Sequence, residues 1–316
     1  MSSRISSSHA DRSLGPALGL LLCLTLSACG GGGGSSDGAT PSSVVSGESE
    51  SASATLSSAD AGAAADATLS TTQMVVASAT AGQMVNCPGG GQASYTLSSG
   101  SDDGTLDPGD VYTLTFTQCS GAVGAVAVNG QVMFSVTGTA LNQVSGTLLF
   151  QGLQATLPQS TLTLQGSAVL SGGLLYSRSG NTLDTVVQTN LSASQLGVTR
   201  QGPQRNTAYT LSSLSLSSNT TYVAGVVSQR TLTGRATVTA SLPSGSYSAS
   251  FSADADVAFS NGVPATGQWT VTTPNLLLSV QAQSGQVTVS VDRNKDGSID
   301  RTTTWTTATW TDSEGS

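Results

Sequence analysis

Apolar and polar residues alternate along the chain from about Val85 onward. Apolar side chains stand at every second position in many runs, for example Tyr112, Leu114, Phe116 and Val287, Val289, Val291. Thr, Ser and Gln fill most of the positions between them. This period of two is typical of a β-strand that packs one face on a core and turns the other to water. No long stretch shows the spacing of an amphipathic helix, so the pattern predicts a single all-β domain over residues 85–312.

Small polar residues followed by glycine separate these runs. Five such pairs are Asn129-Gly130, Ser145-Gly146, Ser244-Gly245, Asn261-Gly262 and Ser284-Gly285. These pairs favour the tight turns that join antiparallel neighbours. We therefore expect a large antiparallel meander of roughly a dozen strands, as a curved sheet or a closed or near-closed barrel, because large open sheets curl or split. Glycines at similar intervals, from Gly130 to Gly285, also hint at hairpin units, although their spacing is too irregular for a sequence repeat.

The segment before this domain has a different composition. From Gly30 to about Gln73 it consists largely of Gly, Ser, Ala and Asp, with almost no aromatic or large apolar side chains. Such a segment buries too little surface to offset the entropy lost on ordering. We therefore expect residues 29–84 to form a flexible tether. The more apolar end of this segment, Met74–Met84, is compatible with either a first strand or a short helix.

Residues 1–28 have the features of a signal peptide: a basic start, a short apolar run and small residues before the cleavage point. The apolar run is shorter than the roughly 20 residues of a membrane-spanning helix. The sequence Leu-Ser-Ala-Cys that ends at Cys29 resembles the lipobox of bacterial lipoproteins. This resemblance implies that Cys29 is the first mature residue and carries palmitate-type acyl chains on its sulfur and amine.

A glycine, Gly30, follows that cysteine, which resembles lipoproteins sent to the outer membrane. The resemblance implies a protein of the cell envelope that is held on the membrane by its N-terminal lipid, with the leaflet left open. The alternative is an ordinary secretory signal followed by an incidental cysteine.

Charge and histidine content exclude several functions. Only 9% of the residues are charged and the formal net charge is −8, so nothing favours binding to nucleic acid or anionic lipid. The chain has a single histidine, His9, which lies in the leader. The mature chain therefore has no Ser-His-Asp or Cys-His nucleophilic site and no zinc site that contains histidine.

Two cysteines, Cys87 and Cys119, remain once Cys23 is removed with the leader and Cys29 is lipidated. In an exported chain, two remaining thiols indicate one structural disulfide. The redox-active alternative lacks a Cys-x-x-Cys pair.

One segment near the C-terminus matches the start of an EF-hand-type calcium loop. Oxygen-bearing side chains stand at alternate positions around Gly297, namely Asp292, Asn294, Asp296, Ser298 and Asp300. Thr303 replaces the glutamate expected at position twelve, and strand patterns rather than helices flank the loop. We therefore predict a weak Ca²⁺ site, with a dissociation constant of about 10⁻⁴–10⁻³ M. The alternative is a polar hairpin turn whose side chains cap their own backbone.

A poorer version of this loop precedes Tyr112 and carries Asp103, Asp107 and Asp110. The Cys87-Pro-Gly-Gly-Gly start, the turn from Asp107 to Asp110 and the closing hairpin up to Asp292 together resemble β-rich envelope lipoproteins of proteobacteria. This resemblance implies an envelope location and no particular activity.

Three hypotheses for function follow. The first is a non-catalytic binding or structural component whose concave sheet face holds a lipid or a glycan. The second is a surface adhesion or matrix module that acts by display, and the third is a histidine-free glycosidase that uses Asp254 and Asp256, about 7 Å apart on one strand. A deep pocket lined by Trp269 or Trp305 would favour the first, a filled core the second, and paired buried carboxylates in a cleft the third.

Overall fold

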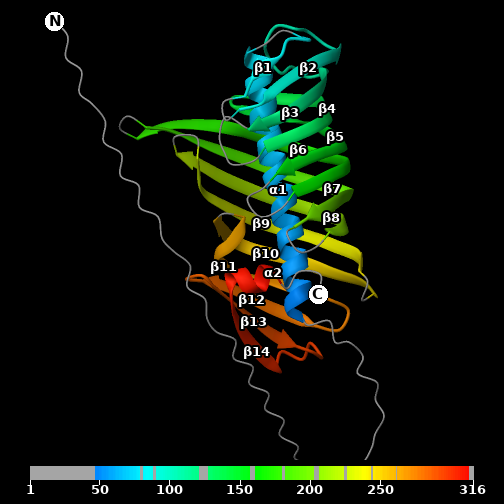
Figure 1. Cartoon of the computed structure of the whole chain (residues 1–316), viewed down its shortest axis with the longest axis vertical. Helices are drawn as coiled ribbons and strands as arrows, with labels where there is room; N and C mark the ends of the chain where they lie inside the picture. Colours follow the sequence, from blue (N-terminus) through cyan, green and yellow to red (C-terminus); the bar gives the residue numbers. More distant parts are fainter. Residues whose placement is uncertain are drawn as a thin grey trace, which may run out of the picture. The chain divides into compact units, whose positions relative to one another are not determined.

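The structure, a computed structural model, describes residues 47–312 except 79–80, 88–89, 121–126, 157–160, 180–181, 203–205, 224–225, 243–244 and 261. The described residues form two helices and a sheet (Figure 1). The elements are α1 (Gly47–Ser78), β1 (Val85–Asn86), β2 (Gln92–Ser99), β3 (Val111–Ser120), β4 (Ala127–Ala140), β5 (Gln143–Thr156), β6 (Thr161–Ser179), β7 (Thr182–Gln201), β8 (Asn206–Val223), β9 (Val226–Leu242), β10 (Gly245–Ser260), β11 (Val263–Thr272), β12 (Leu277–Gln283), β13 (Gln286–Asp292), β14 (Arg301–Thr306) and α2 (Thr307–Asp312).

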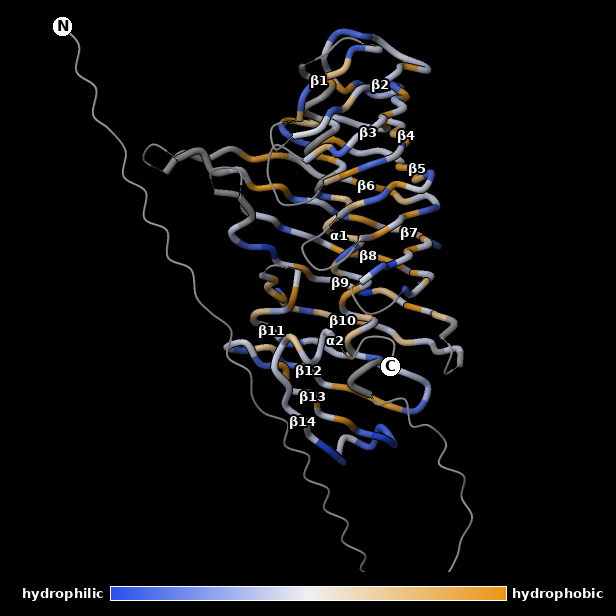
Figure 2. Tube along the Cα trace, viewed as in Figure 1, coloured by the Kyte–Doolittle hydropathy of each residue, from blue (hydrophilic) through white to orange (hydrophobic). Residues whose placement is uncertain are grey.

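The sheet confirms the predicted meander. Its 14 strands lie in sequence order, from β1 at one edge to β14 at the other. The strands begin at Val85, as the alternation predicted. Tyr112, Leu114 and Phe116 of β3 are all buried while the residues between them are partly exposed, so the period of two is realised. Figure 2 shows the same alternation of apolar and polar residues along many of the strands. Because β1 and β14 are the two edges, the sheet is open. Figure 1 shows that it is also curved.

Many of the long strands carry an irregularity near their middle, and these irregularities line up across the sheet. Pairing shifts between Asn129 and Val132 on β4, between Gln151 and Leu153 on β5, between Ser212 and Ser215 on β8, and between Ala253 and Val257 on β10. Five glycines along this row have φ between +74° and +128°: Gly130, Gly152, Gly166, Gly234 and Gly267. β-Bulges bend the strand that carries them. We call this row of irregularities the bulge line.

Two of the predicted turns, at Gly130 and Gly146, were wrong. Gly262 and Gly285 do lie in turns. Gly130 and Gly146, in contrast, lie within β4 and β5. At Gly130, glycine provides a positive φ at a bulge. At Gly146 it leaves room for the ring of Phe134, since a Cβ there would lie 2.4 Å from a ring carbon.

Helix α1 shows that the tether prediction was wrong for residues 47–78. Every residue from Ser51 to Asp66 is buried. α1 contacts β2, each strand from β6 to β13, and α2, and in Figure 1 it runs across the strands. We call the face of the sheet that packs on α1 the inner face and the opposite one the outer face. Among the described residues, neither helix is long and apolar enough to cross a membrane.

Small side chains explain how α1 is buried without an apolar stripe. Ala, Ser and Gly let a helix approach its neighbours closely, and Gly62 lies where a Cβ would be 3.3 Å from Leu232 of β9. Side-chain hydroxyl groups of the helix donate hydrogen bonds to backbone carbonyls one turn earlier. Thr55 Oγ1 donates to the Ser51 carbonyl at 2.7 Å, and Ser58 Oγ donates to the Ala54 carbonyl at 2.8 Å. A buried hydroxyl with a partner avoids most of the desolvation cost. The composition that pointed to disorder is therefore compatible with a helix enclosed by a sheet.

Candidate functional site

Two buried ion pairs join α1 to the inner face of the sheet. Asp60 of α1 lies 3.1 Å from Arg200 Nε on β7, and Asp66 lies 3.5 Å from Arg230 Nε on β9. The four side chains are between 0% and 11% exposed. Buried charges are costly unless each faces an opposite charge and further hydrogen bonds.

Asp66 has such hydrogen bonds. Its carboxylate accepts hydroxyl hydrogen bonds from Thr189 on β7 and from Ser218 and Thr220 on β8, the last two at 2.7 Å. Arg230 Nε also donates to Thr220 Oγ1 at 3.0 Å. Asp66 is therefore the centre of a polar network that ties the helix to three strands.

Burial raises the pKa of the acidic groups on α1. Desolvation raises the pKa of Asp60 to about 6, although the charges of Arg200 and Arg230 act to lower it. The pKa of Asp66 is raised as well, chiefly by burial. Burial also raises the pKa of Glu50 to about 7. We therefore expect the stability of the contact between α1 and the sheet to depend on pH between the ordinary carboxyl range and neutrality.

Two tryptophans fix the N-terminal half of α1. Trp269 Nε1, on β11, donates to Thr55 Oγ1 at 2.7 Å, and Trp310 Nε1, on α2, donates to Ser51 Oγ at 3.0 Å. The two rings meet edge to face, with centroids 6.1 Å apart. Trp269 is therefore buried and packs on α1. Trp305 lies on β14, whereas Trp310 lies on α2.

The predicted disulfide between Cys87 and Cys119 is present, with the two Cα atoms 5.4 Å apart. Both cysteines are buried. The bond joins the segment after β1 to β3, next to backbone hydrogen bonds from Cys87 N to the Gly91 carbonyl and from Ser120 N to the Gly90 carbonyl. Cys29, the predicted lipid-attachment site, lies outside the described residues.

The predicted calcium loop joins β13 to β14, and backbone groups contact its carboxylates. Asp292 is buried and accepts hydrogen bonds from the backbone N–H groups of Asp296 and Gly297, at 3.3 and 2.8 Å. Asp296 accepts one from Ser298 N at 2.8 Å, and Asp300 accepts one from Arg293 N at 2.7 Å. This is the arrangement of a self-capped polar turn. Asn294 donates to Asp296 at 2.7 Å.

No three acidic, cysteine or histidine side chains gather in a metal-holding arrangement in the part of the chain that the structure describes. Weak calcium binding at Asp292, Asn294, Asp296, Ser298 and Asp300 stays a prediction, to be tested by titration with calcium.

The earlier acidic loop is built in the same way. Asp110 is buried and accepts hydrogen bonds from Tyr112 Oη at 2.7 Å and from the backbone N–H of Asp107 at 2.9 Å. Its carboxylate therefore holds the turn before β3.

The two acids considered for glycosidase chemistry lie in solvent. Asp254 is 83% exposed and forms an ion pair of 3.4 Å with Arg235, which is 74% exposed. Asp256 is exposed as well. Both belong to the bulge of β10, and this solvated position is not the cleft of buried carboxylates that would favour the third hypothesis.

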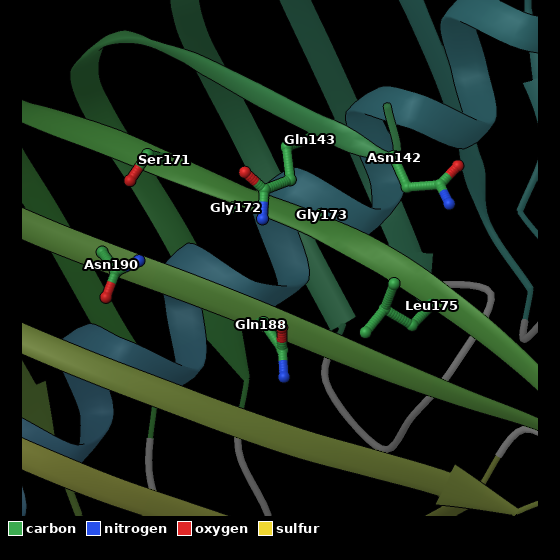
Figure 3. Close-up of a pocket in the computed structure, with 8 residues that line it drawn as sticks. All are labelled: Asn142, Gln143, Ser171, Gly172, Gly173, Leu175, Gln188 and Asn190. Carbon is green, nitrogen blue, oxygen red and sulfur yellow. The ribbon is translucent and has the colours of Figure 1, made fainter. Parts of the chain in front are cut away.

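Two adjoining cavities lie on the sheet, with volumes of about 70 and 260 Å³. They share Gln188 and Asn190 of β7. Figure 3 shows the smaller one, where Gln143 and Gln188 lie beside Gly172 and Gly173 of β6. A Cβ at position 173 would lie 1.8 Å from the Asn142 carbonyl, so glycine allows the β4–β5 turn to close on β6. These cavities could not be predicted from local sequence because their residues come from several strands. The one local signal is the pair of amides at alternate positions 188 and 190.

A third and more open cavity, of about 670 Å³, lies along β8, β9 and β10 and is lined in part by Tyr209, Thr210 and Thr239.

Comparisons of the chain with protein-family models, with curated proteins and with solved structures found no match.

Proposed function

We propose that the protein is a non-catalytic structural component of the bacterial cell envelope that displays the outer face of its sheet. In this proposal Cys29 carries the lipid that anchors the chain to the outer membrane. The display hypothesis is favoured over an internal lipid or glycan pocket by one observation: α1 occupies the inner face of the sheet, with every residue from Ser51 to Asp66 buried.

The surroundings of α1 support the same choice. A site that carries a ligand in its interior needs a cavity lined by groups that face the ligand. Here Trp269 faces Thr55 of α1, and Asp66 faces the hydroxyls of β7 and β8. The inner face of the strands that α1 crosses is thus engaged in contacts within the chain, and in this proposal the outer face is the one that meets partners.

Native mass spectrometry of the full chain, purified from its own membranes, tests the display role. The expected spectrum shows the lipidated polypeptide without a further bound molecule from the interior. A phospholipid that stays bound after denaturant-free gel filtration, and that is lost when the chain is unfolded, would overturn the proposal.

Labelling with radioactive palmitate tests the anchor. The full chain is expected to take up label and to fractionate with membranes, and the Cys29→Ser variant to lose both properties. A variant with Cys87→Ser and Cys119→Ser serves as the control and is expected to keep the label. Label on the Cys29→Ser variant would contradict the anchor.

A further inference from the structure

The two cavities that share Gln188 and Asn190 form one depression, which extends from the β4–β5 turn and β6 across β7, β8 and β9 to Asp256 of β10. Its central residues are Gln188, Asn190, Ser217, Asn219, Thr231 and Thr233, and we call it the amide groove. Each of these side chains is exposed or half-buried.

The hydrogen bonds of neighbouring residues place the amide groove on the outer face. Thr189 and Ser218, which alternate with groove residues, donate to Asp66 of α1 and so point inward. Leu232, which stands between Thr231 and Thr233, is buried and approaches Gly62 of α1. Since side chains alternate along a strand, the groove residues point away from the helix.

Strand pairing arranges the groove residues in two rows. Gln188 pairs with Asn219, which pairs with Thr231, and Asn190 pairs with Ser217, which pairs with Thr233. Neighbouring strands lie about 4.8 Å apart, so each row presents one hydrogen-bonding side chain every 4.8 Å or so across the strands. The spacing suits an extended chain of pyranose rings, with about one ring for each strand crossed.

The chemistry of the lining also suits a sugar. Amide and hydroxyl groups both donate and accept hydrogen bonds, as sugar hydroxyls do. Ser217 Oγ donates to the side-chain oxygen of Asn190, which orients this amide and leaves its Nδ2 group to donate. One carboxylate, Asp256, lines the end of the larger cavity and would accept from a hydroxyl.

Other ligand classes fit less well. A lipid chain needs an apolar lining, whereas the six central residues of the groove all carry amide or hydroxyl groups. A nucleic acid needs basic groups, whereas the chain has a net charge of −8. A peptide that adds to a sheet needs an unpaired strand edge, and β7, β8 and β9 are paired on both sides.

From these observations we infer that the amide groove binds a neutral, linear polysaccharide, with Asn190 and Asn219 as the main hydrogen-bonding residues. The inference deepens the proposed function and rests on it, because it names the class of partner that the displayed face contacts.

Calorimetric titration of the full chain with cellohexaose, chitohexaose and maltohexaose tests the inference. At least one of these hexasaccharides is expected to bind saturably, and a neutral Gly-Ser peptide of similar length is not. Asn190→Ala and Asn219→Ala are each expected to weaken the binding about tenfold, since each removes a polar partner of the ligand. The melting temperature of both variants should match that of the unaltered chain, because both side chains are exposed.

Gln281→Ala supplies the matched control, because Gln281 is an exposed amide on β12, outside the groove. It is expected to bind as the unaltered chain does. The absence of binding to all three hexasaccharides would overturn the inference, as would asparagine variants that both bind as tightly as the unaltered chain.

These results are separate from those that decide the proposed function. A chain that binds no hexasaccharide, yet keeps its lipid anchor and an empty interior, leaves the display role standing. Cleavage of a bound hexasaccharide, detected by chromatography of the products, would overturn the non-catalytic role and leave the groove as a sugar site.

Discussion

Trp269 Nε1, on β11, donates a hydrogen bond of 2.7 Å to Oγ1 of Thr55, which lies 214 residues earlier, on α1. The same hydroxyl donates to the Ser51 carbonyl one turn back along the helix. The Thr55 hydroxyl therefore forms one hydrogen bond within the helix and one with the sheet. Through the second bond, Trp269 fixes the position of the helix along the inner face.

Trp269→Phe is expected to lower the free energy of unfolding by about 1–3 kcal/mol, because it removes one hydrogen bond and part of a buried ring. Urea unfolding followed by circular dichroism measures the change. Trp305→Phe is the control, since Trp305 is partly buried and its Nε1 has no hydrogen-bond partner among the described residues. Equal effects of the two substitutions would show that the bond to Thr55 contributes nothing.

Asp66→Ala tests the polar network. The substitution leaves Arg230 without its carboxylate, and three hydroxyls without their acceptor, in a buried site. Breaking a buried pair in this way costs about 3–5 kcal/mol. Asp254→Ala is the control, because Asp254 lies at a similar distance, 3.4 Å, from Arg235 but in solvent. An exposed ion pair contributes only about 0–1 kcal/mol to stability. Similar losses in the two variants, measured by urea unfolding, would contradict the role of Asp66 as an anchor of α1.

Gly234→Ala tests the bulge line. A Cβ at position 234 would lie 2.1 Å from the Ser215 carbonyl oxygen, and φ there is +123°, so both the space and the backbone conformation oppose a side chain. We expect a loss of roughly 3 kcal/mol or more in the free energy of unfolding.

The control for that change is Gly262→Ala. Gly262 has a φ of +79° and no atom within 4 Å of the added Cβ, so the substitution isolates the backbone penalty. A cost of about 1–2 kcal/mol is expected there. If Gly234→Ala were as mild as its control, β8 and β9 would have room to separate and the close approach at the bulge would not be needed for the fold.

The strands could be predicted from the sequence because their burial pattern is local. Alternation over a few residues says which side chains face the core, and the first strand indeed begins at Val85. Gly130, in the bulge line, lies in a polar residue–glycine pair that predicts a turn, and a positive φ serves a turn and a bulge equally well. Only the pairing of distant strands distinguishes the two.

Helix α1 could not be predicted in the same way. Its burial depends on partners far away along the chain, such as Thr189 and Ser218 for Asp66, 123 and 152 residues distant. Its own side chains are small or polar, so composition alone indicates disorder. The disulfide, in contrast, followed from elimination among four cysteines. The amide groove is assembled from several strands, and its one local signal is the pair of amides at positions 188 and 190.

The acids of α1 make the stability of the chain depend on pH. In the folded chain the pKa of Glu50 is raised to about 7 and that of Asp60 to about 6, and that of Asp66 is raised too. In the unfolded chain these groups titrate near pH 4. Between these values the folded chain holds protons that the unfolded chain has released, so the free energy of unfolding is expected to fall as pH rises from about 4 to about 7.

Below pH 4 the opposite dependence is expected. The pKa values of Asp102, Asp103 and Asp296 are lowered, mainly by hydrogen bonds to each carboxylate, so the stability that these groups contribute is lost as the pH falls through the acidic range. The maximum stability should therefore lie near pH 4–5, and urea unfolding at pH 3, 4.5, 6 and 8 would locate it. Asp60→Asn removes one of the raised groups and should flatten the decline between pH 4.5 and 8, whereas Asp254→Asn, in solvent, should leave it unchanged. A free energy of unfolding that rises steadily from pH 4.5 to 8 would show that the carboxyls of α1 are not desolvated in the folded chain.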